Sequence, residues 1–276
     1  MSVVNTNISG LIGLNNLRLT NLGLQTSLER LSSGLRINHA SDDPSGLAIA
    51  KGMEAQIGGI RTAVQNAEDG INLIRTADGS LSETQDILLR MRDLAVRAAN
   101  EATLTSADLT RLNNEFNSLM DEIDRKSTAV TFNTKVLFDG TLFAAGQVLQ
   151  IGPDNGATFQ LTVTIPALDA AGLGINTASV GVVVDAQSAI TLINSAINQV
   201  SDVRANLGIQ ERRLDHIIDD LKAADINISA AKSRIYDADM AVEISEFTRL
   251  QILQQSGTAI LAQANAQPQS VLQLLK

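Results

Sequence analysis

The sequence has 276 residues, of which 18% are charged, and its formal net charge at pH 7 is −9. A chain with this excess of acidic groups repels phosphate backbones, so the composition argues against a nucleic-acid partner. Cysteine is absent, which excludes disulfides, thiolate metal sites and cysteine nucleophiles.

Hydrophobic residues make up 44% of the chain but aromatic residues only 3%. This aliphatic composition favours seams between long helices over a core built on rings. The first basic residue is Arg18, so the start of the chain lacks the positive region of a secretory signal peptide. No apolar run approaches the ~20 residues that cross a bilayer. We therefore expect neither a cleaved signal nor insertion into a membrane.

The first helical pattern covers residues 8–35. One stripe with spacings of three and four, in which Asn21 is the polar member, consists of Leu14, Leu17, Leu24, Leu28, Leu31 and Leu35. Leu11, Leu19 and Leu22 lie off this stripe, and a helix that is apolar on more than one face is buried on more than one side. We interpret this as a surface for contacts between subunits; burial within an intramolecular bundle is the alternative.

A polar stretch at residues 39–46 ends this pattern, and Pro44 within it can occupy the first turn of a new helix. The adjacent Asp42 and Asp43 could suggest a cation site. The stretch lacks the alternating oxygen ligands and the closing glutamate of a calcium loop, so a turn followed by a helix start is the favoured interpretation.

The next segment predicts a long helix over residues 44–100 with a coiled-coil seam. Apolar residues recur every seven positions, at Ile60, Ala67, Ile74, Leu81, Leu88 and Ala95. Four glycines, Gly58, Gly59, Gly70 and Gly79, are expected to weaken this helix. A capping residue at Thr105 and an acid at Asp108 then predict the start of a second helix, which folds back on the first as an antiparallel hairpin.

Residues 130–184 are the only β-rich part of the sequence. Phe159, Leu161, Val163 and Ile165 alternate with polar residues, which is typical of a half-buried strand. Residues 148–151 predict a second short strand, and Gly152–Gly156 a hairpin loop between the two. Residues 136–143 are expected to form a strand or a loop.

Beyond Asp185 the helical pattern returns. Eight apolar residues follow a strict period of seven, at Ile193, Val200, Leu207, Leu214, Leu221, Ile228, Ile235 and Val242. A second row is interrupted by Arg204, Glu211 and Asp225. Such a period predicts another long coiled-coil helix.

A terminal helical pattern follows, and Pro268 ends it. Its apolar residues at spacings of three and four are Met240, Ile244, Phe247, Leu250 and Leu253. With the leucine stripe of the first helix, these residues are the predicted assembly seams.

The fold class is therefore mainly α: a long antiparallel coiled-coil helical bundle with a small β-hairpin insert and paired N- and C-terminal helices. We expect residues 1–43 and 233–276 to form a terminal coiled-coil domain. Residues 44–130 and 185–232 would form the helical bundle, and residues 131–184 the insert.

Catalytic chemistry has little basis in this sequence. His39 and His216 stand alone in polar surroundings, and the metalloprotease, phosphate-loop, dinucleotide and nucleophile-elbow motifs are missing. Asp219 and Asp220 form an acid pair that is more typical of a solvated helix face. We predict no catalytic residue, no cofactor and no metal.

Several long segments resemble those of the bacterial flagellins. They are residues 28–38 (LERLSSGLRIN), 41–49 (SDDPSGLAI), 89–100 (LRMRDLAVRAAN), 122–137, 233–240 (SRIYDADM), 252–255 (ILQQ) and 261–272 (LAQANAQPQSVL). They occur in the order of that family and cover about residues 1–140 and 185–276.

The resemblance implies a self-assembling structural subunit of the flagellar filament. The paired termini would line its central channel, the long helices and the β-hairpin would form the surrounding tube, and the large outer domains of other flagellins would be missing. The family is exported unfolded through the hollow flagellum by a type III apparatus, which implies an extracellular protein without a cleaved signal. The implied partners are further copies of the chain, an export chaperone that binds the final helix, and the hook-associated junction and cap proteins.

In some flagellins the block at residues 89–100 is also recognised by a Toll-like innate immune receptor. Carried over by motif, the recognition residues here are Arg90, Leu94 and Glu115. Asp93 and Arg97 stand where glutamate and glutamine are common, which puts this partner in doubt.

Three other interpretations are weighed against a flagellin. A hook–filament junction protein shares parts of the terminal coiled coil but makes only a short ring. A coiled-coil signalling or adhesion protein would need an anchor or a ligand-binding module, and the sequence has neither. A filament-borne metallopeptidase would need a metal motif, which is missing.

Overall fold

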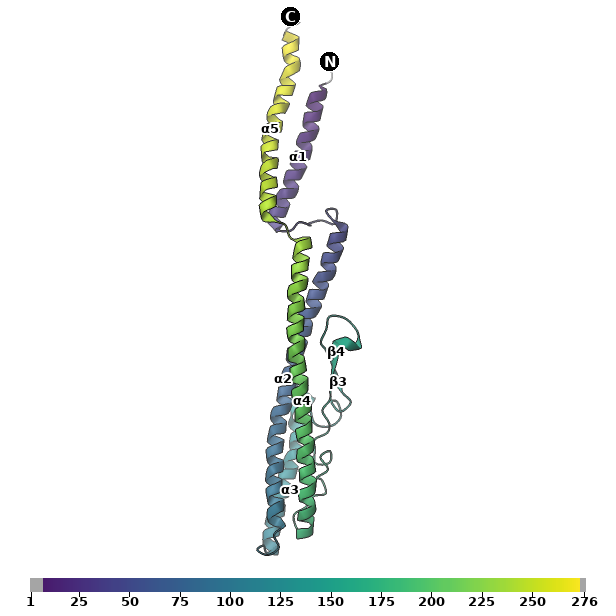
Figure 1. The fold of residues 1–276 in the computed structure, drawn as a ribbon, viewed down its shortest axis with the longest axis vertical. Helices are drawn as coiled ribbons and strands as arrows, with labels where there is room; N and C mark the ends of the chain where they lie inside the picture. The colour runs from purple at the N-terminus through teal and green to yellow at the C-terminus, as the bar shows by residue number, and fades with distance from the viewer. Residues whose placement is uncertain (1–6, 274–276) are drawn as a thin grey trace. The chain divides into compact units, whose positions relative to one another are not determined.

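The computed structural model describes residues 7–273, and long helices dominate this part of the chain (Figure 1). The helices are α1 (Ile8–Ser33), α2 (Pro44–Ala98), α3 (Ser106–Ala129), α4 (Val183–Tyr236) and α5 (Met240–Gln273). The predicted mainly α fold class is confirmed. Helix α5 continues past Pro268, so the predicted end of the terminal helix at that residue is wrong. The chain divides into two compact units. The terminal unit comprises the chain up to Ala55 and from Asn227 onward, and the central unit comprises Gln56–Ile226. The predicted three-part division remains a prediction.

In the terminal unit, α1 and α5 run antiparallel and side by side (Figure 1). The Asn7 side-chain oxygen accepts a hydrogen bond from the Gly10 N–H at 2.9 Å, which satisfies one of the free donors at the start of α1. The helix ends at Gly34, whose φ of +71° suits glycine and whose N–H donates to the Arg30 carbonyl at 2.8 Å.

The turn between α1 and α2 uses both neighbouring aspartates as hydrogen-bond acceptors. Asp42 accepts from the Asn38 and His39 N–H groups, at 3.0 and 2.9 Å. Asp43 accepts from the Gly46 N–H at 2.8 Å and so begins α2. The backbone bonds from His39 and Gly46 are the main causes that lower the pKa values of Asp42 and Asp43. The interpretation as a turn and a helix start is confirmed.

In the central unit, α2, α3 and α4 pack into an antiparallel bundle (Figure 1). The residues of both predicted heptad rows that fall in its core are buried: Ile60, Ala67, Ile74, Leu81, Leu88 and Ala95 on α2, and Ile193, Val200, Leu207 and Leu214 on α4. The period of seven therefore describes packing within the chain over this region. Farther along α4 the row becomes half-buried, and Val242 on α5 is exposed.

The polar residues that interrupt the second row of α4 form ion pairs with α2. The pairs are Arg61–Asp225 at 3.1 Å, Arg75–Glu211 at 2.7 Å and Asp78–Arg204 at 2.8 Å. At least one side chain of each pair is more than a third exposed, so solvent screens the pairs and each contributes little to stability. Because charges of opposite sign face each other at three positions, the pairs disfavour other alignments of the two helices.

Helix α2 is continuous despite its glycines. A Cβ atom at Gly59 would lie 2.8 Å from the Cβ of Pro153, and one at Gly70 would overlap the Leu149 side chain. The missing side chains at these two positions make room for the β insert, which packs directly against the helix. Apart from its chain neighbours and the nearby backbone of α2 itself, no atom lies within 4 Å of a Cβ placed at Gly58.

Helix α3 begins with the predicted cap. The Thr105 Oγ1 accepts from the Asp108 N–H at 3.3 Å, and the Asp108 carboxylate accepts from the Thr105 N–H at 3.2 Å. This reciprocal capping box satisfies two donors at the helix start. The hydrogen bond from the Thr105 hydroxyl is the largest cause that lowers the pKa of Asp108.

Two small antiparallel hairpins make up the β insert. Strand β1 (Thr131–Phe132) pairs with β2 (Lys135–Val136), and the turn between them holds Asn133 and Thr134 at φ values of +47° and +66°. This pattern suits a two-residue hairpin turn, but a β-branched threonine is strained there.

The second hairpin confirms the predicted strands and loop. Strand β3 (Gln147–Gln150) pairs with β4 (Gln160–Val163), and a 3₁₀ turn, η1 (Ala157–Phe159), follows the loop. The segment at 136–143 is mostly irregular, and Phe138 and Phe143 within it are buried.

Candidate assembly surface

Glycines of one terminal helix lie opposite leucines of the other. A Cβ at Gly13 would lie 3.2 Å from Leu261, and one at Gly257 would lie 3.3 Å from Leu17. Gly23 stands in the same relation to Leu250, at 3.3 Å. Each leucine therefore occupies space that the facing helix leaves open, and the two helices approach closely.

Two side-chain amides connect the helices within this apolar contact. The Gln254 Nε2 donates to the Asn21 Oδ1 at 2.8 Å. The Asn7 Nδ2 donates to the Ala264 carbonyl at 2.9 Å, so the residue that caps α1 also binds α5. Asn21 is the polar member of the predicted stripe, and its partner Gln254 was not predicted.

Polar contacts also hold the start of α5 against α1. Ser27 is only 2% exposed, and its hydroxyl donates to the Glu243 carbonyl at 3.4 Å. The Arg30 guanidinium lies 3.9 Å from the Glu243 carboxylate. Leu35, the last member of the predicted stripe, is half-buried and forms a β-bridge with Asp237. This end of the helix pair is therefore fixed by backbone as well as side-chain groups.

The connection from α4 to α5 is bound to the segment that follows α1. The Arg36 N–H donates to the Tyr236 carbonyl at 2.8 Å, and the Arg36 guanidinium donates to the Ile235 carbonyl at 2.6 Å. The Lys232 ammonium lies 5.8 Å from the centre of the Tyr236 ring, within reach of a cation–π interaction.

The predicted seam residues divide between two faces. Five of them, Leu17, Leu24, Leu31, Phe247 and Leu250, are half-buried or buried in the helix pair. Leucines seven residues apart on α1 thus share the face that meets α5. These residues bring α1 and α5 together within one chain.

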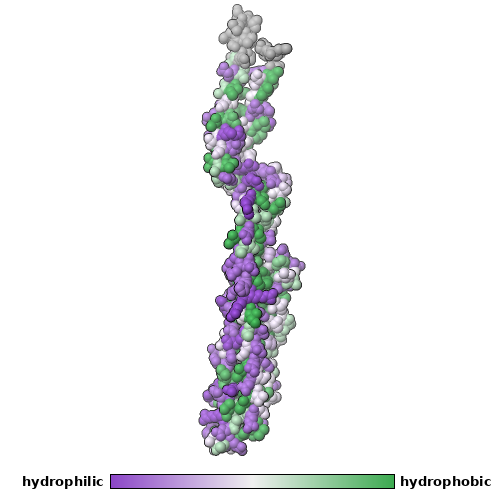
Figure 2. Space-filling view, in the orientation of Figure 1, coloured by the Kyte–Doolittle hydropathy of each residue, from purple (hydrophilic) through white to green (hydrophobic). Residues whose placement is uncertain are grey.

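Of the other predicted seam residues, Leu35 is half-buried and five are exposed, as are apolar residues outside the predicted set. The exposed group comprises Leu14, Leu28, Met240, Ile244 and Leu253, with Ile8, Leu11, Ile12, Leu19, Leu22, Val242, Ile252 and Ile260 in addition. Figure 2 shows apolar patches on both helices of the terminal unit. Exposed apolar patches are typical of interaction sites. Of the additional residues, Leu11, Leu19 and Leu22 were visible in the sequence as leucines off the main stripe.

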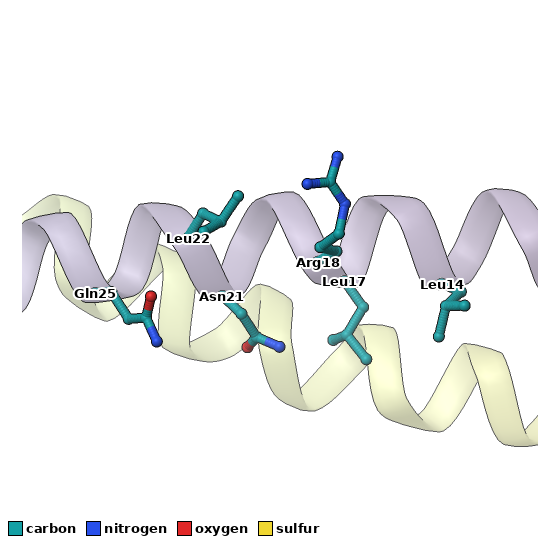
Figure 3. Close-up of a pocket in the computed structure, with 6 residues that line it drawn as sticks. All are labelled: Leu14, Leu17, Arg18, Asn21, Leu22 and Gln25. Carbon is teal, nitrogen blue, oxygen red and sulfur yellow. The ribbon is translucent and has the colours of Figure 1, made fainter. Parts of the chain in front are cut away.

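A shallow groove of about 420 Å³ runs along α1 and is lined by Leu14, Leu17, Arg18, Asn21, Leu22 and Gln25. In Figure 3, Leu17 and Asn21 point towards α5, whereas Arg18 and Leu22 point away from it. The groove therefore joins the face that meets α5 to the open face of α1.

The three candidate receptor residues lie around α2 and α3. The Arg90 Nε donates to the Glu115 carboxylate at 2.9 Å, and both side chains are exposed. Leu94 is only 2% exposed and belongs to the core. A receptor could therefore contact Arg90 and Glu115 on this surface but not Leu94. Recognition by a receptor remains a prediction.

Over residues 7–273, no three His, Cys, Asp or Glu side chains are grouped closely enough to hold a metal ion. The His39 Nε2 instead lies 2.8 Å from the Glu29 carboxylate. Within the same described range, no helix is both apolar and long enough to traverse a bilayer.

Two family models match most of the chain. The N-terminal helical region of bacterial flagellin matches residues 4–142, and the C-terminal helical region matches residues 190–275. The chain is 44% identical to a flagellin of Bacillus subtilis, over 99% of both sequences. It is also 44% identical to a flagellin of Halalkalibacterium halodurans, over 99% of this chain and 100% of the relative.

The solved structures agree with these matches. A crystal structure of Bacillus cereus flagellin is 33% identical, with a TM-score of 0.50 over 61% of this chain and 94% of that one. A putative flagellar hook-associated protein of Vibrio parahaemolyticus is 16% identical, with a TM-score of 0.58 over 71% of this chain and all of that one, and shows a similar fold. The chain belongs to the bacterial flagellin family, and it is a structural subunit of the flagellar filament and not an enzyme.

Proposed function

We propose that the subunit is exported unfolded through the hollow flagellum and then polymerises through seams formed by α1 and α5. The product is the extracellular filament that drives motility. The observation that carries this proposal is the apolar surface that remains exposed on both helices after they have paired, for example at Leu14, Leu28 and Ile244.

Energetic considerations support assembly as the step that orders these helices. Ordering the backbone costs about 1–2 kcal/mol per residue, and full burial of a leucine contributes about 1.5–3 kcal/mol. Many apolar side chains of the pair are still solvated, so pairing alone recovers only part of the available burial energy. Neighbouring subunits supply the remainder, and the free subunit has disordered termini until it docks.

The same apolar surface would bind the partners that act before assembly and those at the two ends of the filament. An export chaperone covers apolar residues of α5, such as Ile252 and Ile260, while the chain is in the cell. The junction and cap proteins contact the terminal helices at the two ends of the filament. The absence of cysteine suits export in the unfolded state, because no disulfide can lock the chain beforehand.

The rival function is that of a hook–filament junction protein. Its fold would be similar, and the hook-associated relative is too distant to distinguish the two functions. The C-terminal segment Leu261–Leu272, whose sequence resembles that of flagellins, favours the filament subunit. Length of the polymer separates the alternatives, because a junction protein makes only a short ring.

Purified monomer should be mixed with short filament seeds and observed by negative-stain electron microscopy. We expect long hollow filaments that grow from the seeds. A parallel sample without seeds controls for spontaneous aggregation, which would give irregular deposits. Rings, or no polymer from a folded monomer with intact termini, would reject the proposal and favour the junction protein.

A further inference from the structure

An amide pair interrupts the otherwise apolar contact between α1 and α5. The Asn21 and Gln254 side chains are half-buried and joined by a hydrogen bond of 2.8 Å. Leu17 and Leu24 flank Asn21 on the same face of α1, and the buried Leu250 precedes Gln254 by one turn. In Figure 3 the Asn21 amide points towards α5 beside Leu17. Two amides so placed satisfy each other only when they are opposite.

Leucines alone do not determine how the two helices align. If α5 slid by one heptad in either direction, Phe247 or Leu261 would come to lie opposite Asn21. Gln254 would then face a leucine of α1. Most apolar contacts would survive such a slip, because apolar side chains are plentiful on both helices. Both amides, however, would lose their partners in a half-buried position.

The glycine–leucine contacts act in the same direction, and so do the backbone bonds at the Leu35–Asp237 end of the helix pair. Leu17 lies opposite Gly257, and Gly23 lies opposite Leu250. A slip by one heptad would place Leu17 opposite Leu250 or Ala264 instead. One of these arrangements places two leucines at a close helix crossing, and the amide pair is broken in either.

We propose that the Asn21–Gln254 pair selects a single alignment of the two terminal helices. Replacing both residues by leucine would strengthen apolar pairing but remove its specificity, as with buried polar residues in coiled coils. This inference rests on the proposed function, because the alignment is measured in the assembled filament. A slip of one heptad would displace the outward apolar residues by about 10 Å along the axis.

The absence of cysteine allows the alignment to be measured by engineered disulfides. One chain carries Leu17→Cys with Gly257→Cys, whose positions face each other. The other carries Leu17→Cys with Ala264→Cys, which lies one heptad farther along α5. That displacement is about 10 Å, beyond the ~7 Å limit between the Cα atoms of a disulfide. Filaments are grown from seeds, oxidised and dissociated, and the chains that remain monomeric on a non-reducing denaturing gel are analysed by peptide mass spectrometry to locate the disulfides within one chain.

With the native amide pair we expect the 17–257 disulfide, and the 17–264 disulfide at less than about one tenth of its yield. With Asn21→Leu and Gln254→Leu, the yield of the 17–264 disulfide should rise several-fold relative to the 17–257 disulfide. The matched control, Asn16→Leu with Gln251→Leu, makes the same exchanges at exposed positions and should keep one alignment. Double-leucine filaments that form only the 17–257 disulfide would overturn the inference.

The exchanged pair, Asn21→Gln with Gln254→Asn, restores an amide on each helix and should retain one alignment. If the double-leucine chain fails to polymerise while the exchanged pair and the control succeed, the requirement for the amide pair is supported. If the exchanged pair also fails, the inference is wrong. Failure of the parent chain to elongate seeds would instead refute the proposed function, and the inference with it.

Discussion

Leu28→Ala tests whether the exposed apolar face of α1 is buried by neighbouring subunits. The substitution removes three carbon atoms, worth about 2.4 kcal/mol at ~0.8 kcal/mol per buried carbon. The 55% of Leu28 that is exposed within the chain leaves roughly 1.3 kcal/mol of this for contacts between subunits. Because α1 becomes ordered only on docking, burial of Leu28 within the chain is also gained on polymerisation, so this figure is a lower bound. Since 1.4 kcal/mol corresponds to a factor of ten, the critical concentration for polymerisation should rise at least roughly tenfold.

The assay is seeded polymerisation at a series of subunit concentrations, followed by sedimentation of the polymer. Alanine favours helix slightly more than leucine, so a loss of helix propensity cannot explain the expected effect. Thermal unfolding of the monomer should be unchanged. The reverse is expected for Leu88→Ala, a change in the core of the central bundle. It should lower the thermal stability of the monomer, by about 2–5 kcal/mol, and leave the critical concentration nearly unchanged. A critical concentration for Leu28→Ala close to that of the parent would refute the reasoning.

Three further predictions concern folding of the central unit. Gly58→Ala should add about 0.5–1 kcal/mol of folding stability, because alanine has less backbone freedom in the unfolded chain. Gly59→Ala should not add stability, because its methyl group would press on Pro153. Equal melting temperatures for the two variants would contradict this. Thr134→Gly should add about 1 kcal/mol by relieving the strain at φ +66°, and a loss in urea denaturation would count against it. The pKa of the Asp108 carboxyl, which caps α3, is lowered from 3.8 in the folded chain. Its contribution to folding stability is therefore complete above pH 3.8 and is lost as the pH falls through the lowered pKa. Asp108→Asn should flatten this decline in acid melts, and an unchanged decline would exclude the cap as its source.

The helices of this chain are well predicted because their signals are local. Pro44 and the aspartate before it determine where α2 begins, and the reciprocal bonds of Thr105 and Asp108 determine the start of α3. The period of seven on α2 and α4 likewise predicts which side chains are buried in the bundle.

Features that depend on the partner of a residue were harder to predict. In the sequence, Glu211 appears only as an interruption of an apolar row. In the structure it forms an ion pair with Arg75, which lies far away in the chain. Gly59 and Gly70 suggested weakness in α2, because sequence alone does not show that the β insert packs there. The role of a small residue becomes evident only when the atoms that approach it are known.

The sequence also predicted only part of the face of α1 that contacts α5. Spacings of three and four placed Leu14, Leu17 and Leu28 on one stripe, but of these only Leu17 is half-buried within the chain. Glycines shift the closest approach towards their own side of α1. Glycine has no side chain and so does not contribute to an apolar pattern. The sequence pattern therefore indicated only part of the face of α1 that contacts α5.

Tyr236 gives the protein an internal spectroscopic probe. It is the single tyrosine of a chain that has no tryptophan, so ultraviolet emission above the weak phenylalanine signal arises from one ring. Tyr236 belongs to the terminal unit. Its backbone carbonyl accepts a hydrogen bond from the Arg36 N–H, and the Lys232 ammonium lies over the face of its ring. Ordering of the terminal unit during filament growth can thus be followed in real time by fluorescence, without a label and with the central bundle contributing no tyrosine signal.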